Sequence, residues 1–176
     1  MAESLKGNLL IAAPSLFDYF RRAVVLLLEH SDEGAMGVVL NRASETTVAE
    51  AVPALAELTG DADELVRLGG PVSPDSVVAL GDFEDLDDAA APVSGSLGLI
   101  DPDRAPLSLR RLRAYAGYAG WGPGQLEGEL EEQAWIVEPA RSDDPFQDGD
   151  IWSGTLQRKG GAFALLATMP AEPSLN

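Results

Sequence analysis

A glycine-rich segment and a single histidine are the two places in this 176-residue chain where side-chain type and spacing could support chemistry. Four glycines fall between residues 117 and 124, directly before a predicted amphipathic helix over residues 124–132. Glycine permits close backbone approaches, and a helix N-terminus offers unpaired N–H groups to an anion. Trp121 adds a flat ring, and Gln125 and Glu129 stand four apart on one helix face. The segment predicts either a ligand pocket with Trp121 as a wall, or a tight strand-to-helix turn in which Trp121 fills the core.

The pocket hypothesis gives a specific set of binding residues and a class of function. The expected ligand-binding candidates are Asn41, Gly70, Trp121, Gln125 and Glu129. They would line a groove for a small molecule or a peptide, so the first hypothesis is a non-catalytic regulatory binding module whose partner is a small molecule or a protein.

His30 is a weak catalytic candidate and supports a second hypothesis, a hydrolase-like enzyme. Imidazole is the side chain whose ordinary pKa lies near neutrality, so it can act as a general base. Glu129 or Asp32 would be its carboxylate partner. This function requires a carboxylate within hydrogen-bond reach of His30 in an open cleft. The alternative is that His30, at the end of a predicted strand, is a structural hydrogen-bonding group.

Neither a metal nor a cofactor is expected. The chain has no cysteine and one histidine, which excludes thiolate and multi-histidine metal centres. The glycine patterns of phosphate-binding and dinucleotide-binding loops are missing, as is the nucleophile elbow of hydrolases. Residues 143–150 cluster carboxylates but lack the ligand spacing and closing glutamate of a calcium loop, so we expect a solvated loop there.

The charge balance disfavours direct binding of nucleic acid. Twelve Lys and Arg against 29 Asp and Glu give a net charge of −17. DNA-binding proteins neutralise phosphates with basic side chains, so a DNA-binding transcriptional regulator is the weakest of three hypotheses. The one cluster of cations in the sequence is interpreted as the charged face of a strand or helix. It comprises Arg104, Arg110, Arg111 and Arg113.

No membrane partner is expected, and we predict a cytoplasmic protein. The N-terminus lacks the charged start and apolar stretch of a secretory signal. The longest apolar run, residues 23–28, is far shorter than the roughly 20 residues that span a bilayer.

The elements that must position these residues predict an α+β fold in one domain, residues 1–176. Its sheet is expected to be mixed and largely antiparallel, with about six to seven strands and helices packed on its faces. The strands are expected within residues 7–14, 23–30, 37–42, 77–80, 98–100, 134–137 and 162–167. The helices are expected at about 46–58, with a kink at Pro53, and at 124–132, while 151–157 is either a helical turn or a strand. Residues 81–106 are a possible loop insertion, and the tail, 169–176, is not expected to be helical.

Several segments in combination resemble the AlgH/YqgE family of bacterial proteins over nearly the whole chain. They are Gly34–Arg42, Gly69–Val72, Gly117–Leu130 and the ending Pro173–Asn176. The resemblance implies an α+β domain with a mixed sheet, and it brings no catalytic set to transfer. The positions that match the family's signature are His30, Gly34, Gly37, Asn41, Gly69, Gly70, Pro71, Gly117, Tyr118, Gly120, Trp121, Gln125, Leu126, Glu129 and Trp135.

Overall fold

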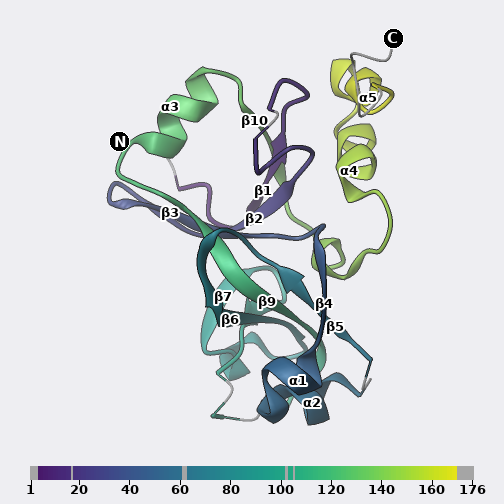
Figure 1. The fold of residues 1–176 in the computed structure, drawn as a ribbon. Coiled ribbons are helices and arrows are strands. Elements are labelled where there is room, and N and C mark those ends of the chain that lie inside the picture. Colours follow the sequence, from purple (N-terminus) through teal and green to yellow (C-terminus); the bar gives the residue numbers. More distant parts are fainter. Residues whose placement is uncertain (1–3, 17, 61–62, 102, 105, 170–176) are drawn as a thin grey trace.

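The computed structural model describes residues 4–16, 18–60, 63–101, 103–104 and 106–169, and Figure 1 shows how its elements are arranged. The strands are β1 (Asn8–Ala12), β2 (Val24–Ser31), β3 (Gly34–Val39), β4 (Ala43–Thr47), β5 (Leu65–Leu68), β6 (Val72–Phe83), β7 (Ala91–Ser94), β8 (Leu97–Leu99), β9 (Leu109–Trp121) and β10 (Trp135–Pro139). The helices are α1 (Val48–Ala51), α2 (Pro53–Thr59), α3 (Gln125–Glu131), α4 (Ile151–Lys159) and α5 (Ala162–Leu166), with 3-10 turns η1 (Leu86–Asp88) and η2 (Asp144–Phe146). Within these ranges, no helix is long and apolar enough to cross a membrane.

The strands join in one sheet with the order β10-β1-β2-β3-β9-β6-β8-β7. The β4–β5 hairpin joins this sheet through β5, which pairs with β9 in parallel, and the other pairings are antiparallel. The predicted α+β class and largely antiparallel sheet are therefore confirmed. The predicted number of strands is too low, since the described residues form ten. Strands such as β4 and β7 were missed because Ala-Ser-Glu-Thr-Thr and Ala-Pro-Val-Ser carry no apolar alternation.

Strand β9 belongs to both halves of the sheet. Its last residues, from Ala119 to Trp121, pair with β3, while the longer part before them pairs with β6 and β5. Figure 1 shows α3, α4 and α5 around the half that contains β1, β2 and β3, and α1 and α2 against the other half. The end of β9 therefore leads directly into the glycine-rich turn and α3.

The strands β1 and β2 are buried on both faces, which is why their sequences are continuous apolar runs. Successive residues alternate between two core clusters, so that Leu9 contacts one and Leu10 the other. Trp152 of α4 belongs to the first cluster and Leu126 of α3 to the second. Helices on opposite faces of the sheet thus shield the two central strands.

The predicted kinked helix is confirmed as two short helices, α1 and α2. The side chain of Thr47 caps the first by accepting a hydrogen bond from the N–H of Glu50. The chain leaves helical geometry at Val52, and Pro53 begins the second helix, where its missing N–H costs nothing. Gly60 ends α2 in the left-handed conformation.

The predicted buried strand at residues 162–167 is wrong, because this segment is the helix α5. Gly160 and Gly161 both have positive φ, which ends α4 and redirects the chain into a second helix. Helical spacing then turns Leu165 to solvent, where it is 71% exposed, and none of the helix's residues is fully buried. A short apolar run fits a strand and a helix equally well, so periodicity alone could not distinguish them.

Two other segments take regular structure. Residues 151–157, for which strand and helical turn were alternatives, lie in α4. Within residues 81–106, β7 and β8 extend the sheet beyond β6, and Val93 and Leu97 are buried there. The C-terminal tail from residue 170 lies outside the described residues.

Candidate functional site

Trp121 lies in the core and not on an open surface. It is the last residue of β9 and is 6% exposed. Its ring meets that of Trp135 edge-on at 6.1 Å and stacks on Phe20 at 6.4 Å between centroids. Of the two alternatives for the glycine-rich segment, this placement matches the tight turn with a tryptophan in the core.

Glu129 and Gln125 hold this turn together through hydrogen bonds. The Oε1 atom of Glu129 accepts from the indole N–H of Trp121 at 3.0 Å and from that of Trp135 at 2.8 Å. Its Oε2 atom accepts from Nε2 of Gln125 at 3.0 Å, and Oε1 of Gln125 accepts from the N–H of Gly122. One carboxylate thereby satisfies two indole donors that burial would otherwise leave unpaired.

Asn41 and Gly70 also make structural contacts. The amide of Asn41 accepts from the N–H of Val24 at 3.0 Å and donates to the carbonyl of Arg22 at 2.8 Å. Gly70 packs its backbone against the backbone of Tyr118 so closely that a Cβ would overlap it. The five predicted binding residues therefore make structural contacts at three places: the turn before α3, the start of β2, and the packing of Gly70 against β9. None of the five lines the cavity that lies between β10 and α5.

The side chain of His30 is buried, at 5% exposure. The backbone N–H of Leu5 donates to Nδ1 at 2.8 Å, so Nδ1 carries no proton and the Nε2 proton faces Oε1 of Glu127 at 2.6 Å. This hydrogen bond is the first cause of the lowered pKa of Glu127. Both ring nitrogens are occupied, and the partner is neither Glu129 nor Asp32. This geometry leaves no nitrogen free to take a proton from a substrate.

We expect the free energy of unfolding of Glu127→Gln to fall less on acidification than that of the wild type. Because the folded-state pKa of Glu127 lies below its ordinary value, the carboxylate stabilises the fold at higher pH, and this stabilisation is lost as the pH falls through the lowered pKa. The free energy of unfolding should therefore fall less in the variant than in the wild type between about pH 6 and about pH 3. Urea unfolding across this range measures it. Glu131→Gln, an exposed change of the same charge on α3, is the control, and equal slopes for the two variants would contradict the prediction.

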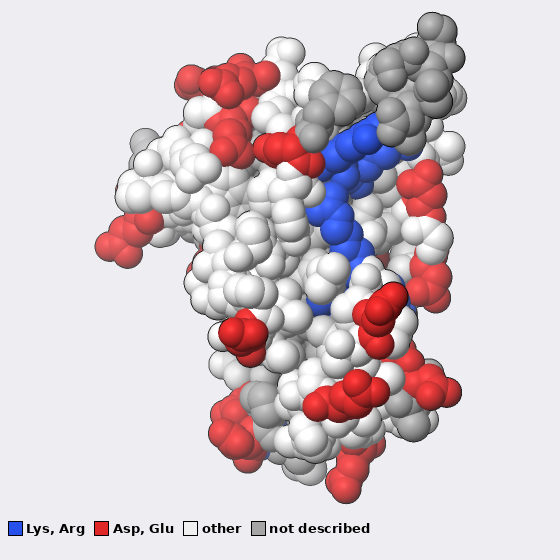
Figure 2. Space-filling view, in the orientation of Figure 1, with Lys and Arg blue, Asp and Glu red and all other residues white. Residues whose placement is uncertain are grey.

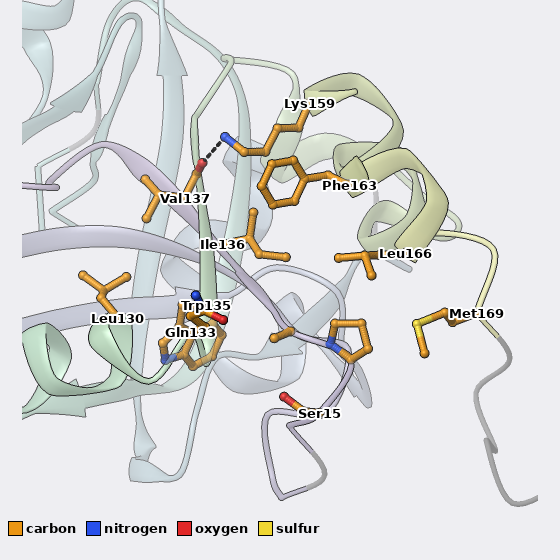
Figure 3. A pocket seen from close by; sticks show the side chains of 12 residues that line it. Ser15, Leu130, Gln133, Trp135, Ile136, Val137, Lys159, Phe163, Leu166 and Met169 are labelled. Carbon is orange, nitrogen blue, oxygen red and sulfur yellow. Dashed lines mark hydrogen bonds between the residues drawn. The ribbon is translucent and has the colours of Figure 1, made fainter. Parts of the chain in front are cut away.

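The cavity between β10 and α5 has a volume of about 900 Å³. Figure 3 shows Ile136 of β10 facing Phe163 and Leu166, which project from the C-terminal helical region. The cavity is lined by Ala13, Pro14, Ser15, Leu130, Gln133, Trp135, Ile136, Val137, Lys159, Phe163, Leu166 and Met169. It was missed at the level of sequence because three separate segments of the chain build it, within residues 13–15, 130–137 and 159–169. The available signal was the set of apolar residues at 163–166.

Of the described residues that line this cavity, Lys159 is the charged one. Its ammonium group donates to the carbonyl of Val137 at 2.8 Å and lies 5.1 Å from the ring centroid of Phe163. Glu138 is 3.9 Å away. The cavity therefore combines an apolar wall with a fixed cation at the strand edge.

The cluster of arginines seen in the sequence lies mostly on β9 and is paired with carboxylates. Asp82, which is 3% exposed, lies 2.9 Å from Arg111 and 3.9 Å from Arg110. Arg113 lies 3.3 Å from Glu64. Arg111 and Arg113, two positions apart, share one face of β9, whereas Arg110 points to the other face and Arg104 precedes the strand, so the cluster is not a single charged face.

Carboxylates of the acidic segment 143–150 also have protein partners. Asp144 binds Arg158 through two hydrogen bonds of 2.7 and 3.0 Å, and Asp150 caps α4 through the N–H of Ser153. These side chains stabilise the connection between β10 and α4.

Comparison with known proteins places the whole chain in a single family. A family model described as DUF179, AlgH-like, matches residues 9–164. The UPF0301 protein SCO2948 of Streptomyces coelicolor is 44% identical over 187 aligned positions, which cover 98% of this chain and 96% of that protein. A UPF0301 protein of Nocardia farcinica is 40% identical over 182 positions and covers 97% and 85%.

Two solved structures share the fold. The crystal structure of protein DIP2367 from Corynebacterium diphtheriae has a TM-score of 0.85 and 30% identity, covering 96% of this chain and 94% of that one. The solution structure of the AlgH protein from Pseudomonas aeruginosa has a TM-score of 0.70 and 29% identity, covering 97% and 96%. The resemblance seen in the glycine-rich segments is thereby confirmed, and the chain belongs to the AlgH-like, UPF0301 family.

Proposed function

We propose that this chain is a non-catalytic binding module for a small amphipathic molecule, with an apolar body and one anionic group. The site is the cavity between β10 and α5, not the glycine-rich turn. The observation that carries this proposal is the apolar cavity of about 900 Å³, in which Lys159 is the one charged residue among the described lining residues.

The size and lining of the cavity favour a small-molecule ligand. Ligand pockets typically measure about 300–1,000 Å³ and are mainly apolar, with a few polar groups that orient the ligand. Here Ile136, Phe163 and Leu166 supply an apolar wall that the core clusters cover only in part. Each square ångström of apolar surface that a ligand covers contributes about 25 cal/mol. An acyl chain or a ring system would thus bind through burial alone.

The polar groups of the cavity favour an anionic head group. The ammonium of Lys159 has three N–H donors, of which one is used by the carbonyl of Val137. The others can bind a carboxylate or sulfonate in competition with Glu138, which lies 3.9 Å from the ammonium. The net charge of −17 repels an anion at long range. The attraction between the anion and the ammonium of Lys159 therefore acts only at short distance.

A peptide that adds a strand to β10 fits this edge less well. The carbonyl of Ala134 and the N–H of Ala140 form hydrogen bonds with the chain at the two ends of β1. Because backbone groups alternate in direction along a strand, the carbonyls of Val137 and Pro139 face outward. Two of the outward carbonyls are already occupied, that of Val137 by Lys159 and that of Pro139 by Arg158 at 3.2 Å. Charged side chains and proline are the usual means of blocking an edge strand.

We expect decanoate to bind wild-type protein and to bind Leu166→Glu at least about tenfold more weakly, because a carboxylate in the cavity must be desolvated. Isothermal titration calorimetry below the concentration of micelle formation measures the affinity. Leu165→Glu, a neighbour that is 71% exposed and lies outside the cavity, is the matched control and should bind like the wild type.

The role of Lys159 is tested by comparing decanoate with decanol. A hydrogen bond between charged groups contributes about 1.5 kcal/mol, so Lys159→Met should weaken decanoate binding about tenfold and leave decanol binding unchanged. Absence of decanoate binding, or equal losses in Leu166→Glu and Leu165→Glu, would overturn the proposal. Equal losses for both ligands in Lys159→Met would refute the anionic head group.

A further inference from the structure

Lys and Arg side chains gather in one band on the face shown in Figure 2, although acidic residues outnumber them 29 to 12. The guanidinium of Arg22 lies 4.3 Å from the ring centroid of Trp152, and that of Arg42 lies 5.0 Å from that of Tyr19. Both also donate to backbone carbonyls. Among the described residues, neither has a carboxylate within 4.0 Å. Aromatic rings and carbonyls thus hold these two cations, and no carboxylate of the described part of the chain compensates their charge.

The neighbouring arginines, Arg67 and Arg113, form a second and more buried pair. Arg42 adjoins this pair, because the backbone carbonyl of Arg42 accepts a hydrogen bond from the N–H of Leu68, the residue after Arg67. Arg113 and Tyr115 stand two apart on β9, hence on one face of the sheet, and Arg67 on β5 is the register partner of Tyr115. The Nη2 atoms of the two arginines lie 3.4 and 3.5 Å from the same atom, Oδ1 of Asp148.

This pair has more donors than acceptors. The side chains of Arg67 and Arg113 are 19% and 10% exposed, and Tyr115 is fully buried. Among the described residues, Nε of Arg67, Nη1 of Arg113 and the hydroxyl of Tyr115 are buried without a hydrogen-bond partner, as is one acceptor, Oε1 of Glu64. Buried polar atoms are nearly always paired. Three unpaired donor groups against the one unpaired oxygen of Glu64 still indicate a missing acceptor at this site.

Asp148 is a weak counter-ion for this pair. Its side chain is 80% exposed, and both of its contacts lie at the long end of the range for ion pairs. Glu64 lies 3.3 Å from Arg113 and is the other carboxylate within 4.0 Å of the pair among the described residues. If Asp148 moves away, two guanidinium groups face one carboxylate, and the site carries a net positive charge.

We propose that the Arg67–Arg113 pair binds a small phosphate-type oxyanion, which takes the place of Asp148 against the two guanidinium groups. Guanidinium groups bind phosphate oxygens through paired N–H donors, and a tetrahedral anion supplies several acceptors at once. Arg22 and Arg42 raise the local potential along the approach to the site. None of these residues lines the cavity beside β10, so this site stands independently of the proposed function.

The test is isothermal titration calorimetry with pyrophosphate at constant ionic strength. We expect saturable binding to the wild type and a loss of at least about tenfold in Arg67→Met, because a bidentate charged contact is removed. Asp148→Asn should bind about fivefold more tightly, since the competing carboxylate is gone. Arg104→Met and Asp32→Asn make the same charge changes at exposed positions and should bind like the wild type.

Further arms distinguish the chemistry of the anion and keep the test decisive. Inorganic phosphate should compete with pyrophosphate, whereas acetate at equal ionic strength should not. Thermal unfolding without ligand shows whether Arg67→Met is folded, and the surface change Asp148→Asn tests the site without disturbing buried groups. The proposal is overturned if the wild type does not bind pyrophosphate, in which case water fills the unpaired positions. It is also overturned if Arg67→Met equals Arg104→Met, or if Asp148→Asn equals Asp32→Asn.

Discussion

Gly70→Ala should abolish the native fold or lower its free energy of unfolding by more than about 4 kcal/mol. A Cβ at this position would overlap the carbonyl group of Tyr118 and the N–H of Ala119. These are backbone atoms of β9, the strand that both halves of the sheet share, so they cannot rotate aside as a side chain would. Urea unfolding, together with the dispersion of backbone amide signals in NMR spectra, measures the effect.

The same substitution at Gly128 is the control. This glycine lies in α3, and a Cβ there would meet nothing within 4 Å. Alanine stabilises a helix interior by up to about 1 kcal/mol relative to glycine, so Gly128→Ala should be neutral or stabilising. A stable, native Gly70→Ala protein would show that the backbone contact at Tyr118 can relax, which contradicts the close packing of these two backbone segments.

Glu129→Ala should lower the free energy of unfolding by about 3 kcal/mol, because it leaves two largely buried indole N–H groups unpaired at about 1–3 kcal/mol each. Those donors belong to Trp121 and Trp135, which are 6% and 5% exposed. Urea unfolding followed by tryptophan fluorescence measures the loss.

Glu129→Gln separates the hydrogen bonds from the charge. Its amide oxygen can still accept from both indoles, so the loss should be about 1 kcal/mol. Equal losses in the two variants would mean that the indole hydrogen bonds contribute little, and that the carboxylate charge or the side-chain packing dominates.

The parts of the fold that local sequence determines were predictable. The central strands are recognisable as apolar runs because both of their faces are covered. The break at Pro53 and the cap at Gly60 follow from residue chemistry alone. The segment at 162–167 shows the limit of this reasoning, since the glycines before it and the packing of α5 decided its conformation.

The candidate site was less predictable because long-range contacts decide it. Glu129 of α3 or Asp32 was expected beside His30, and the partner is Glu127. Glu127 and Glu129 are two positions apart and point about 200° apart around a helix. Which of them meets His30 depends on how α3 docks against the sheet. Glu129 points instead to the two tryptophans. The cavity beside β10 is likewise built from segments that are spread along the chain from Ala13 to Met169, and no local sequence pattern shows that they meet.

The continuity of β9 has a mechanical consequence. Its residues near Leu109 pair with β6 in one half of the molecule, and its end at Trp121 pairs with β3 in the other. A shift of this strand along its axis would break the ladders at both ends together. Strand β9 therefore couples the two halves of the sheet mechanically, and strain introduced at one end of the strand is transmitted to the other end.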